Sequence, residues 1–136
     1  MIITRAPLRI SLFGGGTDYA AHYEKHGGAF ISMAVDKFVY VMLKALPPYF
    51  EHSIRLSYSE NEQAVSLRDV KHNAIRVALG HMGIERDIEI VTMADLPART
   101  GLGSGSSFAV ALLHALHAYK GEGVTEVALA RGAIHV

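Results

Sequence analysis

The stretch Gly101-Leu102-Gly103-Ser104-Gly105-Ser106-Ser107 combines three glycines with three serines, and this pattern can do chemistry. It follows a β-like run at residues 87–93 and precedes an apolar helical run at residues 109–116. A glycine-rich loop between a strand and a helix directs backbone N–H groups and the positive end of the helix dipole toward an anion. The stretch therefore predicts a phosphate-binding loop, with an ordinary turn and helix cap as the alternative.

The amino-acid sequence of this loop does not fit two common phosphate-binding motifs. A Walker A loop ends in Gly-Lys-Ser or Gly-Lys-Thr, and no lysine lies between Lys71 and Lys120. A Rossmann fingerprint needs its third glycine one place later, and an acidic residue about 20 positions on at the end of a strand. The acidic residue at that distance is Glu122, which lies in a glycine-flanked loop. A Rossmann-like oxidoreductase is therefore disfavoured.

Composition limits the classes of protein that fit. The 136 residues suit one domain, and half of them are hydrophobic, so we expect a packed core. The 13 basic and 13 acidic residues balance without long runs, so no nucleic-acid or membrane partner is expected. Cysteine is absent, and the amino terminus lacks a signal-peptide pattern, which together favour a cytoplasmic protein.

A second glycine-rich stretch, Gly14-Gly15-Gly16-Thr17-Asp18-Tyr19, follows a β-like segment at residues 2–13. Pro7 should restrict that strand to a sheet edge or a bend. Thr17 or Asp18 could cap a short helix over residues 20–25, with Gly27 closing it. Three glycines and an aspartate can form either a turn or a site, so the residues alone leave both open.

The remaining pattern supplies strands and helices that could position these loops. Residues 29–46 predict two strands or one strand bent near Asp36, and residues 53–59 alternate like a half-exposed antiparallel strand. Ser66 and Asp69 resemble a capping box before an amphipathic helix that runs to Gly83. The helix after the second loop carries His114 and His117, interpreted as a polar face rather than a metal site, and a last helix begins near residue 125.

Together, the two loops resemble the motifs of the GHMP kinases, a family of small-molecule kinases. Residues 6–19, Ala-Pro-Leu-Arg-Ile-Ser-Leu-Phe-Gly-Gly-Gly-Thr-Asp-Tyr, are similar to the family's amino-terminal motif. Residues 97–108, Pro-Ala-Arg-Thr-Gly-Leu-Gly-Ser-Gly-Ser-Ser-Phe, are similar to its nucleotide phosphate loop. The resemblance implies an α+β fold with a mixed or antiparallel sheet and helices packed on it.

The resemblance also implies roles for individual residues. Arg9 matches a basic residue that stabilises the reacting hydroxyl, and Asp18, with Gly16 and Thr17, matches the part that binds the sugar. The loop from Gly101 to Ser107, namely Gly101, Leu102, Gly103, Ser104, Gly105, Ser106 and Ser107, matches the loop around the ATP phosphates. Ser104 matches the serine that contacts Mg²⁺. The implied cofactors are ATP and Mg²⁺.

Within the family, the chain is most similar to the D-glycero-D-manno-heptose 7-phosphate kinase branch. Galactokinases place Glu-His where this chain has Gly15-Gly16, so galactose is not the expected substrate. The family's catalytic aspartate and carboxy-terminal domain would fall beyond residue 136. We therefore expect residues 1–136 to be the phosphate-loop-bearing, amino-terminal domain of a sugar or sugar-phosphate kinase, inactive alone. The alternative from another class is a non-catalytic nucleotide- or sugar-binding module.

Overall fold

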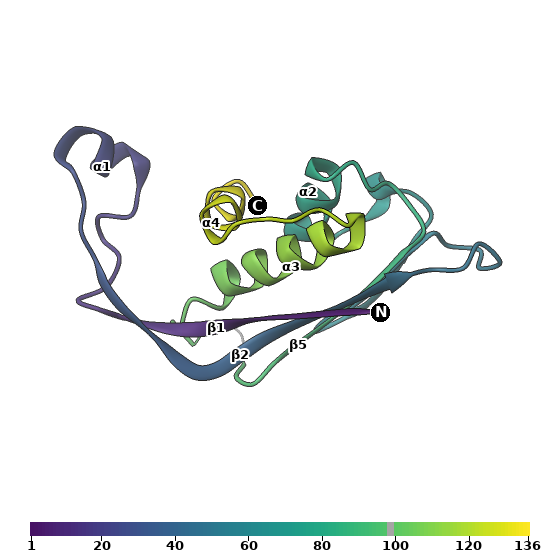
Figure 1. Cartoon of the computed structure of the whole chain (residues 1–136), viewed down its shortest axis with the longest axis horizontal. Coiled ribbons are helices and arrows are strands. Elements are labelled where there is room, and N and C mark those ends of the chain that lie inside the picture. Colours follow the sequence, from purple (N-terminus) through teal and green to yellow (C-terminus); the bar gives the residue numbers. More distant parts are fainter. Residues whose placement is uncertain (98–99) are drawn as a thin grey trace.

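The computed structural model describes residues 1–97 and 100–136 as a sheet with helices packed on one face (Figure 1). The α+β fold and the mixed sheet are as predicted. The strands are β1 (Ile2–Leu12), β2 (Ile31–Ala45), β3 (Ile54–Ser57), β4 (Asn61–Ala64) and β5 (Ile88–Ala94). The helices are α1 (Ala20–His26), the short 3₁₀ helix η1 (Leu67–Asp69), α2 (Asn73–His81), α3 (Ser104–Lys120) and α4 (Glu126–Ala133).

The sheet has the strand order β1-β2-β5-β3-β4. Neighbouring strands are antiparallel except β3 and β5, which run parallel. A doubly wound dinucleotide-binding domain needs a mostly parallel sheet with helices on both faces. The observed topology therefore excludes the Rossmann-like alternative.

Helix α3 forms the centre of the helical layer and lies across β1 and β2. Its side chains Leu112 and Leu116 are fully buried, as are Val41 of β2 and Ile90 of β5 on the facing side of the sheet. A buried hydrogen bond joins the two layers, in which Thr4 Oγ1 donates to the Ala111 carbonyl at 2.7 Å. Burial of apolar side chains on both layers fixes the position of the amino-terminal end of α3.

The two longest strands pair along an irregular ladder. The register between β1 and β2 shifts between Pro7 and Arg9. Pro7 faces Phe38, whereas Arg9, two residues further along β1, faces Ala34, four residues away from Phe38 on β2. Strand β2 bends at this level (Figure 1), so of the two alternatives for residues 29–46 the structure has the single strand bent near Asp36. β1 lies at the edge of the sheet, where a proline without an N–H is tolerated.

In the middle of the chain, one prediction was wrong and one strand was missed. The helix expected from Ser66 to Gly83 is two elements, because the turn η1 ends at Asp69 and α2 begins only at Asn73. Asp69 does accept hydrogen bonds from the Ser66 amide at 3.1 Å and from its hydroxyl at 2.7 Å. Strand β4 was missed because its sequence, Asn-Glu-Gln-Ala, lacks the apolar and β-branched residues that signal a strand.

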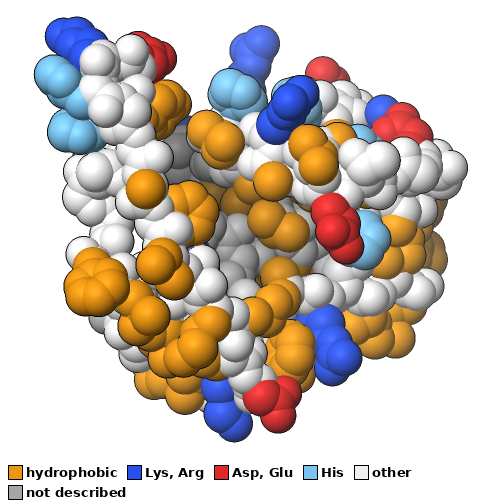
Figure 2. All heavy atoms as spheres, turned by 60° about the vertical axis from the view of Figure 1, so that its left-hand side comes forward, with side chains coloured by type: hydrophobic (Ala, Val, Ile, Leu, Met, Phe, Trp, Pro, Cys, Tyr) orange, Lys and Arg blue, Asp and Glu red, His pale blue; other side chains and the backbone are white. Residues whose placement is uncertain are grey.

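The segment between β1 and β2, residues 13–30, forms an arm that carries α1 away from the body (Figure 1). None of the α1 side chains is buried, and its cap residue is Tyr19, without a side-chain hydrogen bond, in place of the predicted Thr17 or Asp18. Gly27 closes the helix as predicted. Figure 2 shows hydrophobic side chains around the hollow between arm and body. The exposed large hydrophobic residues of the arm and of the strand ends that carry it are Leu12, Phe13, Tyr19, Tyr23, Phe30 and Ile31.

None of the helices in the described part of the chain combines the length and the apolar content needed to cross a bilayer.

Candidate functional site

The glycine–serine loop leads directly into the amino terminus of α3. Gly103 is the cap residue and adopts a left-handed conformation with φ of 70°, which favours glycine. Its carbonyl accepts the first intrahelical hydrogen bond, from the Ser107 amide at 3.0 Å. The preceding amides of the first turn have no intrahelical partner and are available to an anion. Ala98 and Arg99 of the predicted motif lie outside the described residues.

Arg9 brings the two sequence motifs together, although they lie far apart in the chain. Its backbone amide donates to the Leu102 carbonyl at 3.0 Å, and its guanidinium Nη1 donates to Ser106 Oγ at 2.6 Å. A Cβ atom added at Gly103 would collide with the same guanidinium. Gly103 is therefore required for the close approach of Arg9 to the loop as well as for its left-handed backbone.

The three loop serines have different surroundings. Ser106 Oγ accepts from Arg9 and donates to the Gly103 carbonyl at 3.0 Å, so it links the arginine to the loop. Ser107 is only 7% exposed, and its hydroxyl donates to the Pro7 carbonyl at 2.8 Å. This hydrogen bond joins α3 to β1. Among the described residues, Ser104 Oγ has no hydrogen-bond partner. Ser104 is thus the hydroxyl that is free to bind a ligand.

A cavity of about 730 Å³ opens beside the loop, within the usual size range of small-ligand sites. Ser104, Gly105 and Ser106 form its wall at the start of α3. The opposite walls come from β5, the end of β3 and the start of α2, and further apolar residues come from α4. The cavity therefore continues from the loop into a partly apolar space between the helices and the sheet.

Three aromatic rings line this cavity, and sequence reasoning missed them. His72 packs edge-on against Tyr58, with 4.8 Å between the ring centres, and lies 5.5 Å from the ring centre of Phe108. Tyr58 donates its hydroxyl to Glu62 at 3.3 Å, and Glu62 is only 8% exposed. The periodic pattern assigned these positions to a strand, a helix and a loop, and nothing in that pattern places them in one cavity.

Burial and the neighbouring carboxylates raise the pKa of Tyr58. Burial is the larger cause, followed by the charges of Glu62 and Glu60. The phenol therefore keeps its proton at neutral pH and acts as the donor in its hydrogen bond to Glu62. The second oxygen of the Glu62 carboxylate accepts the backbone amide of Lys71.

The first glycine-rich loop lies at the base of the arm. The Thr17 hydroxyl donates to the Ala29 carbonyl at 3.1 Å and accepts from the Ala29 amide at 3.3 Å, so it ties the arm together. Asp18 is exposed, and its carboxylate lies against Gly15, where a Cβ atom would collide with it. Gly16 and Thr17 line a separate cavity of about 330 Å³. No hydrogen bond within the described residues joins Asp18 to Arg9 or to the second loop.

The residues that could bind a divalent cation are few. Within the described ranges, no three or more His, Cys, Asp or Glu side chains cluster as a metal site. His117 Nδ1 lies 3.0 Å from Glu122 Oε2, which fits the predicted polar face of α3. A magnesium ion at the loop would therefore depend on ligand oxygens, water and the free Ser104 hydroxyl, a donor set that suits Mg²⁺ bound with phosphates.

The fold and the loop together define an α+β domain in which a glycine-rich turn opens a buried helix. Residues 69–136, half of the chain, match the model of the GHMP kinases N terminal domain. The chain therefore belongs to the GHMP kinase family. The matched half contains the glycine–serine loop and most of the wall of the large cavity, whereas Arg9, Asp18 and the cavity residue Tyr58 lie outside it. No match was found among curated protein sequences.

Several solved structures share the fold. A D-glycero-D-manno-heptose 1-phosphate kinase from Bacteriodes thetaiotaomicron is 20% identical with a TM-score of 0.82, covering 98% of this chain and 46% of that one. Methanococcus jannaschii mevalonate kinase is 22% identical with a TM-score of 0.68, covering 97% and 44%. Streptococcus pneumoniae phosphomevalonate kinase, in complex with phosphomevalonate and AMPPNP, is 16% identical with a TM-score of 0.74, covering 98% and 41%. This chain thus spans less than half the length of each.

Proposed function

We propose that this chain is the phosphate-loop-bearing domain of a cytoplasmic kinase that transfers a phosphoryl group from ATP to a sugar or sugar-phosphate hydroxyl. The observation that carries the proposal is the contact of Arg9 with the loop, through Ser106 Oγ and the Leu102 carbonyl. A guanidinium beside free helix amides creates a site for a polyphosphate, where charge-assisted hydrogen bonds are strong. Family membership supports the same chemistry.

In this proposal, the backbone from Gly101 to Ser106 binds the ATP phosphates and the neighbouring cavity holds the nucleoside. The size of the cavity, about 730 Å³, and its continuity with Ser104 and Gly105 support this arrangement. Ser104 would give an oxygen to Mg²⁺, which supplies charge neutralisation on the phosphates when bound. Ser107 is assigned a structural role, since its hydroxyl donates its hydrogen bond to the Pro7 carbonyl.

Asp18, with Gly16 and Thr17, is proposed to bind the sugar. The Asp18 carboxylate is exposed and its turn is shaped by Gly15, so it can accept two hydroxyl groups at once. The Thr17 hydroxyl is already hydrogen-bonded to Ala29, so Thr17 would contribute by holding the turn that carries Asp18. The heptose phosphate substrate is supported by the sequence motifs and by the fold shared with the heptose 1-phosphate kinase.

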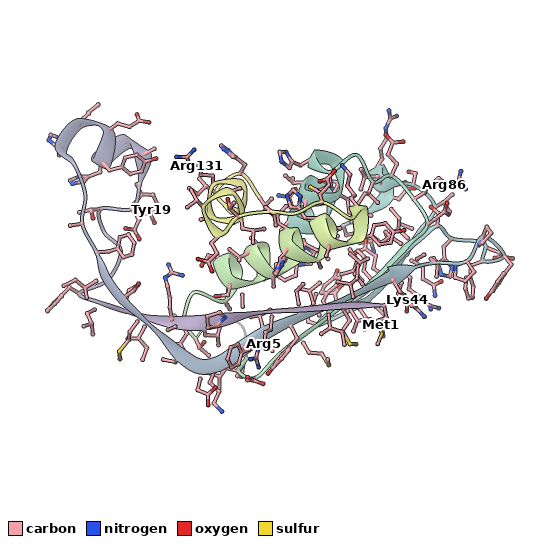
Figure 3. The ribbon with its side chains drawn as sticks, viewed as in Figure 1. Met1, Arg5, Tyr19, Lys44, Arg86 and Arg131 are labelled. Atoms are coloured by element: carbon pink, nitrogen blue, oxygen red, sulfur yellow. The ribbon has the colours of Figure 1, made fainter. Side chains whose placement is uncertain are left out.

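Arg9 can be tested against a matched arginine on the same strand. Arg5 lies on the face of the sheet away from the helices (Figure 3), with its guanidinium carbon 4.4 Å from the centre of the Phe38 ring. We expect Arg9→Met to weaken AMPPNP·Mg²⁺ binding by about 10- to 100-fold while AMP binding changes little, because a charged hydrogen bond is lost. Arg5→Met should leave both unchanged. Equal loss for AMPPNP and AMP in Arg9→Met would contradict the assignment.

A non-catalytic binding module is the second candidate, favoured by one feature of the site. No acidic side chain of the described residues forms a hydrogen bond with Arg9 or with the loop serines, and a positioned general base typically contributes about 10²–10⁴-fold to such reactions. We therefore propose that residues 1–136 bind nucleotide but do not turn over alone. Release of ADP in the presence of hexoses, heptose phosphates or fucose tests this, and sugar-dependent turnover by this chain would overturn it.

A further inference from the structure

In the part of the cavity proposed to hold the nucleoside, the fold determines which ring nitrogen of His72 accepts a hydrogen bond and which can donate one. We infer that His72 selects the base of the nucleotide, by donating its Nε2–H to a ring nitrogen of a purine. The inference rests on the proposed nucleotide site and adds a residue that reads the base. His72 is at once the cap residue of α2 and part of the cavity wall.

The first step concerns the tautomer. His72 Nδ1 accepts the backbone amide of Ile75 at 3.4 Å, and an amide can only donate, so Nδ1 carries a lone pair. In the neutral imidazole the proton is then on Nε2, on the other side of the ring. Within the described residues, Nε2 has no hydrogen-bond partner. The capping bond of α2 thus makes His72 a donor toward whatever enters the cavity.

The second step concerns the position of the ring. Tyr58 packs edge-on against it, at an interplanar angle of 81°, and Phe108 packs at 55°. Glu62 holds two parts of this wall, because one carboxylate oxygen accepts the Tyr58 hydroxyl and the other accepts the amide of Lys71, next to His72 in the chain. With the backbone beside it and the Tyr58 ring held by Glu62, and with Phe108 packed against it, the imidazole presents its donor in one direction.

The third step concerns the ligand. Adenine offers the acceptor nitrogens N1, N3 and N7 on its ring, and the wall around His72 is aromatic, which suits stacking with a flat base. Ser104 and Gly105 line the same cavity from the loop side, so the phosphates and the base would be held at its two sides. A donor left without its acceptor in such a site lowers affinity, and this gives the selectivity.

The experiment replaces each acceptor nitrogen in turn. Isothermal titration calorimetry on the 136-residue chain compares ATP·Mg²⁺ with its 1-deaza, 3-deaza and 7-deaza analogues. One analogue should bind roughly 10-fold more weakly than ATP, because the bound base would cover the His72 Nε2–H without accepting from it. His72→Asn keeps a cap acceptor for α2 but removes the ring donor, so it should bind ATP and that analogue equally. His81→Asn, at the other end of α2, is the matched control and should discriminate as the wild type does.

Each other outcome overturns a distinct part of the account. Equal binding of ATP and all three analogues to the wild type would overturn the role of His72 and leave the phosphate loop intact. Discrimination that persists in folded His72→Asn would assign the donor to another residue. Absence of ATP binding by the wild type would overturn the nucleotide site itself, and this inference with it.

Discussion

The two glycine-rich loops of this chain are similar in composition and differ in what holds them. The loop at Gly14–Asp18 leads into α1, which has seven residues and no buried side chain. The loop at Gly101–Ser107 leads into α3, which has 17 residues, seven of them buried. A helix that is packed on a sheet holds its first-turn amides in place, whereas an exposed helix does not. The difference supports our proposal that the second loop binds the charged phosphates, whereas the first presents an exposed side chain, Asp18, at the base of an arm.

The arm and the helix α4 border one open side of the molecule. Tyr19 lies on the arm and Arg131 on α4 (Figure 3), and hydrophobic side chains surround the hollow between them (Figure 2). No hydrogen bond joins the described residues of the two glycine-rich loops across this side.

The largest contrast is expected from the same substitution in the two loops. Gly14 and Gly103 both have positive φ, of 78° and 70°, but only at Gly103 would a side chain meet Arg9. Gly14→Ala should cost about 1–2 kcal/mol of stability from backbone strain alone. Gly103→Ala should cost a further 1–2 kcal/mol or so, because it also displaces Arg9 from Ser106, and should weaken AMPPNP binding at least about 10-fold.

Urea unfolding and nucleotide titration of both variants provide the measurement. Similar losses of stability and of nucleotide affinity at Gly14 and Gly103 would remove the distinction between the loops. A side chain at Gly103 would meet the guanidinium of Arg9 first.

A second contrast concerns the sugar. Asp18→Ala should weaken sugar or sugar-phosphate binding by about 1.5–3 kcal/mol and leave AMPPNP binding unchanged, since a carboxylate that accepts hydroxyl groups is removed. Asp36→Ala, at another exposed aspartate, is the control. Ligand-observed NMR with a panel of heptose phosphates, hexoses and fucose measures the change. Unaltered sugar affinity would reduce the first loop to a turn.

A third contrast uses glycines whose φ is ordinary and whose Cβ positions are open. Gly105 lies in the first turn of α3 and lines the cavity, whereas Gly16 lies in the arm loop. Gly105→Ala should raise stability by about 0.5–1 kcal/mol through helix propensity, yet weaken nucleotide binding by filling space beside the phosphates. Gly16→Ala should change neither property appreciably. Thermal unfolding and AMPPNP titration should give opposite signs for Gly105→Ala, and nucleotide affinity that is maintained would place the phosphates elsewhere.

The smallest effect concerns the end of the sheet away from the second loop, where Glu89 of β5 pairs with Lys44 of β2. Hydrogen bonding to Arg55 is the main cause that holds the pKa of Glu89 below its ordinary value of 4.5, with Lys44 adding to it. A lowered pKa in the folded state stabilises the protein above the unfolded-state value, and this contribution is lost as pH falls through the folded value. Glu89→Gln should therefore reduce stability at pH 7, and its difference from the wild type should shrink as the pH falls through the folded-state pKa of Glu89.

The control for Glu89 is Glu122, whose pKa is lowered mainly by Lys120 but which is exposed. Glu122→Gln should have a smaller effect on the pH dependence, because water and salt screen exposed pairs. Amide hydrogen exchange compares the two loops, when each measured rate is divided into the intrinsic rate at the same pH to give a protection factor. The Ser107 amide, which donates to the Gly103 carbonyl in the packed helix α3, should be protected at pH 7. The Asp18 amide, which donates to the Gly15 carbonyl in an exposed turn, should have a much lower protection factor. Equal protection of these two amides at pH 7 would contradict the contrast between the loops.

Much of the fold could be predicted from apolar periodicity. The edge strand with Pro7, the bent β2 and the helix after the second loop all follow from local patterns. Strand β4 could not be predicted in this way, because its residue Glu62 is buried through hydrogen bonds rather than through apolar character. The break between Asp69 and Asn73 was missed because apolar spacing continues across it.

Some residues of the candidate site could likewise be predicted from the sequence, and others could not. The loop and its helix could be predicted, because local sequence determines a glycine-rich turn before an apolar helix. The contact between Arg9 and Ser106 depends on how β1 lies under α3, which no local pattern encodes; only the family resemblance placed them in one site. His72 and Tyr58 were missed for a related reason, since their meeting depends on the pairing of β3 with β4 and β5.

The central claim is that the loop from Gly101 to Ser106, together with Arg9, binds the phosphates of ATP. Its most direct test is a titration of the ¹⁵N-labelled 136-residue chain with AMPPNP·Mg²⁺, following backbone amide chemical shifts. We predict the largest shifts at Gly103–Ser106 and Arg9, smaller shifts around the cavity at His72, and little change at Gly14–Asp18. Shifts that are absent from Gly103–Ser106, or that are concentrated at Gly14–Asp18, would contradict the account.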